Sequence, residues 1–173
     1  MSMRFVLLLA VLVFALPVAA VAQEPLNVAP IPEGSLTRDQ LQRVADDIRR
    51  LEANPLAPDV REARARLITW VVESPDVHVT LCGAVLEPLM DTETEGNGYL
   101  TVQHALSMAA YAITHEGTPD RVEANVAGLR GMLGTYAALR EAWGERAVHP
   151  FLEELATTDD LAAYVRPRLV NCD

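Results

Sequence analysis

The chain has 173 residues, enough for one domain, and its 24 acidic residues against 14 basic ones give a formal net charge of −10. All the basic residues are arginines, so chemistry that requires a lysine, such as a Schiff base or a phosphate-binding P-loop, is excluded. An acidic chain without a cationic cluster is also unsuited to binding nucleic acid or an anionic membrane surface.

Residues 1–22 have the pattern of a signal peptide. Arg4 precedes an apolar run from Phe5 to Leu16, and Ala20-Val21-Ala22 forms a small-x-small cleavage site. The apolar run is shorter than the roughly 20 residues that span a bilayer. We therefore predict cleavage, no stable membrane anchor afterwards, and a secreted or periplasmic protein. Residues 23–34 are rich in proline and lack periodicity, which predicts an extended leader.

The remaining residues, 35–173, are predicted to form one all-α domain, a bundle of about six to seven helices. Thr37 and Gln40 have the spacing of a capping box, which predicts the start of the first helix. Asn54-Pro55 is expected to end that helix, because the residue before a proline disfavours helical backbone angles. A second helix is predicted from Pro58 to Glu73.

The third segment is ambiguous. Apolar residues alternate over 77–82 as in a strand, but between His78 and Met90 they also recur at helical spacing. We predict a helix here, begun at Ser74-Pro75 and bent or ended near Pro88. A polar loop, 91–98, is expected to follow.

The next two helices are predicted over 99–116 and 119–143. No charged residue occurs between Tyr99 and Thr114, which indicates a central helix covered on most sides. The second of these helices is expected to lie close to the first along a face of small residues, because glycine inside a helix otherwise costs about 0.5–1 kcal/mol. Two short helices, 150–156 and 159–165, are predicted to close the chain. The three interior glycines are Gly128, Gly131 and Gly134.

Cys82 and Cys172 are the only cysteines. In an oxidising compartment an even number of cysteines in a small domain indicates a disulfide. A redox-active pair is the alternative, but the sequence has no Cys-x-x-Cys motif to support one. We therefore predict a structural disulfide that ties the C-terminal tail to the bundle.

The polar loop resembles the opening of a calcium-binding loop, with acidic residues at its first, third and fifth positions and glycine at its sixth. Its twelfth position is Val102, where such loops carry a glutamate that completes the coordination shell. The alternative is a solvated acidic loop without a metal. The candidate calcium ligands are Asp91, Glu93, Glu95 and Asn97.

Four residues of the segment 99–116 share one helical face and could line a ligand pocket or a protein interface. These residues are His104, Met108, Tyr111 and His115. The two histidines lie about 16 Å apart along a helix, so they cannot bind one metal ion. The alternative is that this face is a second packing surface.

No set of residues in the sequence predicts catalysis. Ser107 lies inside a predicted helix, away from the sharp turn that exposes a serine nucleophile. We therefore expect a non-catalytic protein-interaction module with an unidentified protein partner. The alternatives are a small-ligand carrier, with a pocket between helices 99–116 and 119–143, a weak calcium-binding domain, and an enzyme that works through carboxylates or His104. Calcium is the one cofactor that the sequence suggests.

Overall fold

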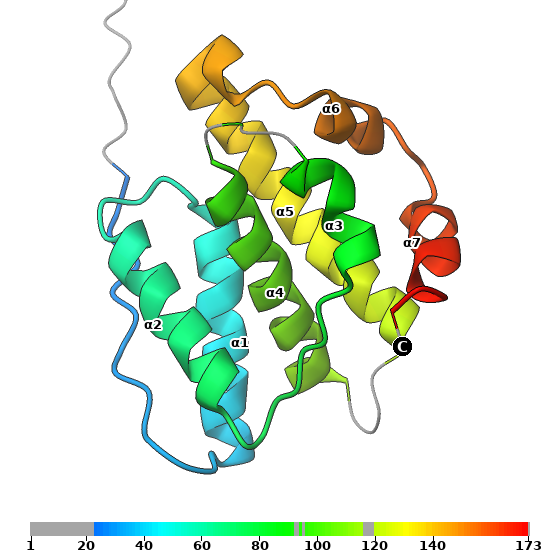
Figure 1. Cartoon of the computed structure of the whole chain (residues 1–173). Helices are drawn as coiled ribbons and strands as arrows, with labels where there is room; N and C mark the ends of the chain where they lie inside the picture. Colours follow the sequence, from blue (N-terminus) through cyan, green and yellow to red (C-terminus); the bar gives the residue numbers. More distant parts are fainter. Residues whose placement is uncertain (1–22, 92–93, 95, 116–119, 173) are drawn as a thin grey trace, which may run out of the picture.

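The structure is a computed structural model that describes residues 23–91, 94, 96–115 and 120–172. These residues form seven α-helices and a short 3-10 helix, without a strand, which confirms the all-α prediction (Figure 1). None of these helices combines the length and hydrophobicity needed to cross a membrane. The helices are α1 (Arg38–Ala53), α2 (Val60–Glu73), α3 (Gly83–Met90), α4 (Asn97–Thr114), α5 (Arg121–Trp143), η1 (Gly144–Ala147), α6 (Pro150–Ala156) and α7 (Leu161–Leu169).

Helix α1 begins at the predicted capping box. The backbone N–H of Gln40 donates to the Thr37 hydroxyl at 3.3 Å, and the Thr37 N–H donates to the Gln40 side chain at 2.7 Å. These two bonds satisfy N–H groups that have no partner inside the helix. The helix ends at Ala53, and Asn54 caps it as predicted.

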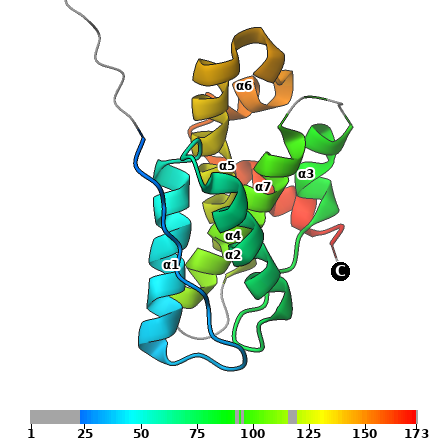
Figure 2. The same cartoon turned by 90° about the vertical axis from the view of Figure 1, so that its left-hand side faces the viewer.

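The leader, residues 23–34, is extended and lies along α1 and α2 (Figure 2). The Asp59 carboxylate accepts the N–H groups of Leu26 and Asn27, at 2.7 and 2.8 Å. Arg50 and Arg66 donate to the carbonyl groups of Leu26 and Val28. Side chains of α1, of α2 and of its N-cap thus hold the leader by its backbone. The leader's own Leu26 and Val28 side chains are buried in the core.

The segment that follows α2 differs from the prediction. No helix starts at Ser74-Pro75; instead, residues 77–82 are extended and α3 begins only at Gly83. The Ser74 hydroxyl accepts the Asp76 N–H at 3.1 Å, a local turn that stops the helix. The extended residues include the β-branched Val77, Val79 and Thr80, which favour that conformation. Pro88 lies inside α3, which continues to Met90, because a proline near the end removes only one helical hydrogen bond.

Two hydrophobic cores lie on either side of α4. The first core joins the leader, α1 and α2 to α4, and includes Ile48, Leu67 and Leu106. The second core joins α3, α5, α6 and α7, and includes Leu129 and Leu152. Helix α4 contributes Leu106 to the first and Leu100 to the second, so it is central, as its lack of charge predicts.

Two of the three α5 glycines make the predicted close approach to α4. A Cβ atom on Gly128 would lie 2.7 Å from His104 Nε2, and one on Gly131 would overlap the Ser107 hydroxyl. Gly134 differs, because a Cβ atom there would have no neighbour within 4 Å. Close packing therefore explains Gly128 and Gly131, and the structure gives no packing reason for Gly134.

The ends of the later helices also differ from the prediction. Helix α4 ends at Thr114, and the N-cap of α5 is Asp120, whose carboxylate accepts two backbone N–H groups of the first turn. The predicted stop and cap, Gly117 and Thr118-Pro119, lie outside the described residues. Helix α6 has its predicted bounds. Helix α7 continues through Pro167 to Leu169 instead of ending at residue 165.

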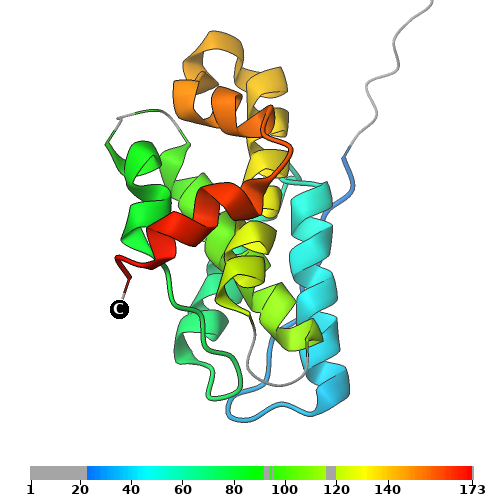
Figure 3. The ribbon, with the colours of Figure 1, turned by 90° about the vertical axis from the view of Figure 1, so that its right-hand side faces the viewer.

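The Cys82–Cys172 disulfide is present, with the two Cα atoms 5.5 Å apart, and confirms the predicted tether of the C-terminal tail. Helix α7 lies across α5 and beside α3 (Figure 3). The Tyr164 hydroxyl donates to the Val85 carbonyl at 2.9 Å, and Arg121 donates to the Cys172 carbonyl at 3.0 Å. The disulfide therefore closes a region that hydrogen bonds and apolar packing also hold together.

Candidate functional site

The structure separates the four residues predicted to share a site on α4. His104 and Met108 are buried against α5, where both would contact a side chain at Gly128. Neither ring nitrogen of His104 has a hydrogen-bond partner in the described part of the chain. Burial lowers the pKa of His104 to about 4, so this histidine is neutral at pH 7.

Tyr111 and His115 lie further along α4 at the surface. Their rings are stacked, with centroids 3.8 Å apart, and they line a groove of about 350 Å³ together with Ser107 and Glu52. The Ser107 hydroxyl donates to Glu52. His115 is eight residues beyond Ser107, about 12 Å along the helix, and its Nδ1 atom lies 2.9 Å from the Tyr111 carbonyl. The groove therefore holds a serine and a histidine that do not form a catalytic pair.

The predicted calcium site falls largely outside the described residues, which exclude Glu93 and Glu95. Asn97 is the first residue of α4 and not part of a loop, and its amide donates to the Leu89 carbonyl at 2.9 Å. Asp91 caps the end of α3. No group of three or more histidines, cysteines or acidic residues suited to a metal ion occurs among the described residues.

A larger cavity, which we call the Arg64 cleft, lies where α4 begins and α5 ends. It has a volume of about 660 Å³, within the range of small-molecule sites. A second hollow of about 370 Å³ adjoins it and shares Arg61, Arg64 and Tyr99. Apolar and aromatic side chains from the α1–α2 connection and from three helices form much of the wall: Leu56, Val60, Tyr99, Leu139 and Trp143.

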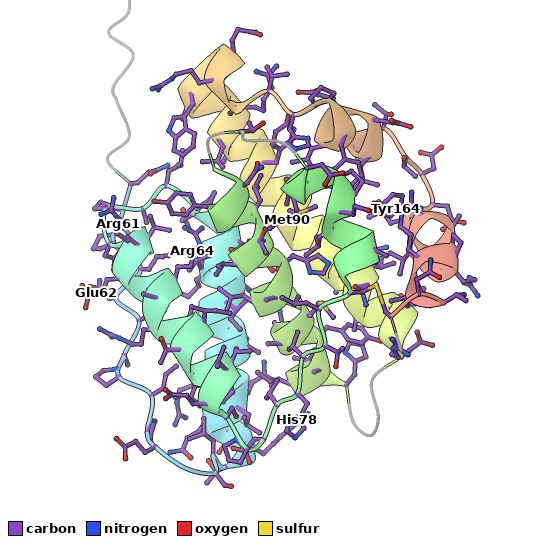
Figure 4. All side chains as sticks on the ribbon, in the orientation of Figure 1. Arg61, Glu62, Arg64, His78, Met90 and Tyr164 are labelled. Atoms are coloured by element: carbon purple, nitrogen blue, oxygen red, sulfur yellow. A yellow bond between two sulfur atoms is a disulfide. The ribbon has the colours of Figure 1, made fainter. Side chains whose placement is uncertain are left out.

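Arg64 is the unusual member of this wall. It is only 5% exposed, and neither its Nε nor its Nη2 atom has a hydrogen-bond partner among the described residues. Its guanidinium carbon lies 4.9 Å from the centroid of the Tyr99 ring, a cation–π contact. Figure 4 shows Arg64 on the side of α2 that faces α4. Burial lowers the pKa of Arg64, yet an arginine remains protonated at neutral pH.

The acidic residues at the cleft remain charged but form no ion pair with Arg64. Asp59 accepts the two N–H groups of the leader, and these bonds lower the pKa of its carboxyl group. Glu62 pairs with Arg66 at 2.7 Å. Arg61, like Arg64, forms no ion pair within the part of the chain that the structure describes. The formal charges of Asp59, Arg61, Glu62 and Arg64 in the cleft wall thus balance, but Arg64 has no direct counter-ion among the described residues.

The start of α4 adds N–H donors to the same place. Its N-cap is Gly96, with φ at 99°, so no side chain caps the helix. The N–H groups of Gly98 and Tyr99, in the first turn, have no acceptor among the described residues. A Cβ atom on Gly98 would have no neighbour within 4 Å, so the backbone is accessible there. The helix dipole adds partial positive charge at this end.

Thr135 of α5 supplies another unused polar group on the far wall. It is fully buried, and its hydroxyl has no hydrogen-bond partner in the described residues. Buried polar groups in folded proteins nearly always have a partner, and buried charges even more so. Other buried residues, such as Gln103 and His104, also have polar atoms without a partner in the described chain, but Arg64 and Thr135 are the two that line this cleft.

The sequence prediction missed this cleft. It predicted a helix from Pro58 to Glu73 but did not assign Arg64 to the buried face of that helix. Arg64 lies four residues after Val60 and three before Leu67, so helical spacing places it on the buried side. This helical spacing is the sequence signal that could have identified Arg64 as a buried residue.

No known protein family matches this chain, and neither the curated proteins nor the solved structures contain a significant match. The chemistry of the Arg64 cleft is therefore the guide to function.

Proposed function

We propose that this protein is a non-catalytic binding protein that carries a small organic molecule in the Arg64 cleft. The observation that carries the proposal is a buried, unpaired arginine in a cavity of about 660 Å³ with apolar walls. A buried charge without a counter-ion destabilises the ligand-free protein, which favours a role in binding over a role in stability. The site lies between α2, α4 and α5, which favours the carrier alternative of the sequence analysis.

We also propose that the protein is secreted or periplasmic. The signal-like residues 1–22 and the Cys82–Cys172 disulfide support this location, because disulfides persist in oxidising compartments. Mass spectrometry of the protein from the extracellular or periplasmic fraction tests it. The expected product starts near Gln23 and carries the disulfide, whereas an intact, reduced chain recovered from the cytoplasm would contradict the proposal.

Binding to a protein partner is the second candidate function. Four large apolar side chains are well exposed, on α2, before α3, at the end of α3 and after α7, and the acidic surface suits a cationic partner. Single exposed apolar residues are common in monomeric proteins, so this observation is weaker than the unpaired arginine. The four residues are Val72, Leu81, Met90 and Val170.

Native mass spectrometry of the protein purified from its host tests the carrier proposal. Ala65 is exposed on α2 and lines both hollows, so Ala65→Phe should fill the cleft without removing a charge. Ala137→Phe, at an exposed position on α5, is the matched control. We expect a small organic molecule to be retained by the wild type and by Ala137→Phe, and lost from Ala65→Phe. A bare wild type, or equal retention by both variants, would overturn the proposal.

A further inference from the structure

We infer that the ligand of the Arg64 cleft is an amphipathic monocarboxylate, bound with its carboxylate against Arg64 and its apolar body against Leu139 and Trp143. This inference rests on the proposed function and specifies the ligand class. Its three supports are the unpaired guanidinium, the free N–H groups at the start of α4, and the division of the cleft into a polar and an apolar part.

The guanidinium selects an anion. Arg64 is more than nine-tenths buried, forms part of the wall of both hollows, and leaves Nε–H and one Nη2 group unused. Nε–H and an Nη group of arginine form a planar fork that matches the two oxygens of a carboxylate. Nε and Nη2 have almost no exposed surface, so an anion in the cleft first meets the guanidinium at Nη1, which is not among its fully buried atoms. A shift of the Arg64 side chain then brings a second nitrogen into contact, and the anion offsets the cost of the buried charge.

The start of α4 lines the same small hollow as Arg64. Gly96 and Gly98 form part of its wall, and the first-turn N–H groups of Gly98 and Tyr99 have no acceptor in the described chain. Such N–H groups, together with the helix dipole, bind anions at many helix starts. The helix start and Arg64 therefore contribute positive charge to the wall of one hollow from two elements.

The neighbouring charges favour one negative charge over two. Asp59 and Glu62 line the larger hollow, and each already has hydrogen-bond partners. A monoanion balances the one buried guanidinium, since Arg61, which also lines both hollows, is exposed and its charge is screened by water. A dianion such as a phosphate monoester would bring a second negative charge close to two carboxylates. The chemistry thus fits a carboxylate better than a phosphate.

The rest of the cleft fits an apolar body. Leu56, Val60 and Leu139 line the larger hollow, and the Tyr99 and Trp143 rings meet edge to face with centroids 6.4 Å apart. Burying apolar surface here contributes about 25 cal/mol for each Å² removed from water. Thr135 adds a hydroxyl on this side, which can bond to one polar group of the ligand.

The test compares three probes with the same chain and different head groups: decanoate, decanol and decyl phosphate. Trp143 lines the cleft and Trp70 does not, so a Trp70→Phe background makes tryptophan fluorescence report on the cleft alone. We expect decanoate to bind at least about tenfold more tightly than decanol, because the charged hydrogen bonds act on decanoate alone. Tighter binding of decyl phosphate than of decanoate would overturn the choice of a monocarboxylate.

Variants of Arg64 separate this inference from the proposed function. Arg64→Met should abolish the preference for decanoate over decanol while decanol affinity stays within about twofold, which also shows that the variant is folded. Arg64→Lys keeps the charge but loses the fork, so an intermediate preference is expected. Arg43→Met, at an exposed position on α1, is the control and should bind like the wild type.

The outcomes are distinguishable. If decanol and decanoate bind equally well, and Ala65→Phe blocks both, the monocarboxylate inference fails while the carrier proposal stands. If none of the three probes binds and the protein from the host retains no molecule, both fail. A preference for decanoate that persists in Arg64→Met would place the anion elsewhere and overturn the role of Arg64.

Discussion

Helices α4 and α5 meet in two different ways along their length. In the middle, His104 and Ser107 pack against Gly128 and Gly131, and no Cβ atom fits between the helices. Where α4 begins and α5 ends, Gly96 lies close to Leu139 and Trp143, and the Arg64 cleft is lined by Tyr99 of α4 together with Leu139 and Trp143 of α5. The same pair of helices thus forms core in the middle and the wall of a cavity at this end.

Both regions contain buried polar groups, but the groups differ in charge. His104 in the packed region is neutral at pH 7, because burial lowers its pKa to about 4. Arg64 in the cleft remains charged, because arginine does not lose its proton near neutral pH. The packed region therefore tolerates its unpaired histidine at neutral pH, whereas the cleft carries a charge that requires a counter-ion.

The largest expected effect comes from the disulfide, which fixes α7 against α3 and α5, whereas no residue of α7 lines the cleft. Cys172→Ser should lower the free energy of unfolding by about 4–5 kcal/mol, since the bond closes a loop of 90 residues. Chemical denaturation measures this loss, and the reduced wild type should show the same midpoint as the variant. Decanoate affinity of Cys172→Ser, measured below its melting temperature, should equal that of the wild type. An equal denaturation midpoint for the oxidised wild type and the variant would contradict a structural role of the disulfide.

The second effect is a loss of stability of the packed region in acid. The folded pKa of His104 is about 4, below its unfolded value of about 6.5, so between these values the unfolded state binds a proton that the folded state does not. Stability should be full above pH 6.5 and fall by about 3 kcal/mol towards pH 4. Burial also lowers the pKa of His149, which acts in the same direction.

Urea denaturation at a series of pH values measures the His104 effect. His104→Leu should flatten the dependence between pH 6.5 and 4, although the variant can differ from the wild type in absolute stability. His115→Leu, which replaces an exposed histidine on the same helical face, is the matched control. An unchanged slope in His104→Leu would show that other groups cause the acid sensitivity.

The third effect concerns the two kinds of glycine in α5. Gly131→Ala should lower the free energy of unfolding by about 1–3 kcal/mol, because its Cβ atom would overlap Ser107 and push the helices apart. Gly134→Ala should raise it by about 0.5–1 kcal/mol, because the position has open space and alanine favours helix. Thermal unfolding of both variants checks the opposite signs; equal signs would refute close packing as the explanation for Gly131.

The smallest effect comes from the cleft itself. Arg64→Met should raise the free energy of unfolding of the ligand-free protein by about 1 kcal/mol, because an apolar side chain of similar length replaces an unpaired buried charge. Calorimetric melting of ligand-free protein measures the change. A large loss of stability in this variant would instead make Arg64 a structural residue.

Local signals predicted most of the fold. The spacing of Thr37 and Gln40 predicted the start of α1, and Pro150 predicted the start of α6. The two cysteines predicted the disulfide that ties the tail to the bundle. The extended segment 77–82 was mispredicted because its apolar residues fit both periodicities, and the Ser74 turn that decides between them depends on side-chain hydrogen bonds.

The candidate site was harder to predict than the fold. Amphipathic patterns assign arginine to the solvent, so Arg64 was not included in the buried face of its helix. The cleft also depends on the meeting of α2 with the start of α4 and the end of α5, a contact between residues far apart in the sequence. His104 was predicted to line a ligand pocket or an interface, and its burial against Gly128 depends on the register of α5 against α4, which the sequence pattern does not give.

The disulfide joins two residues that both belong to, or pack on, the second core. The disulfide therefore stabilises only the second core directly. The first core, with the leader packed on it, is held by non-covalent contacts alone. Amide hydrogen exchange should accordingly show α1 and α2 opening as a unit while α5 and α7 stay protected. Val60 packs on the first core and Leu139 belongs to the second, so a molecule in the cleft would join the two units and slow that opening.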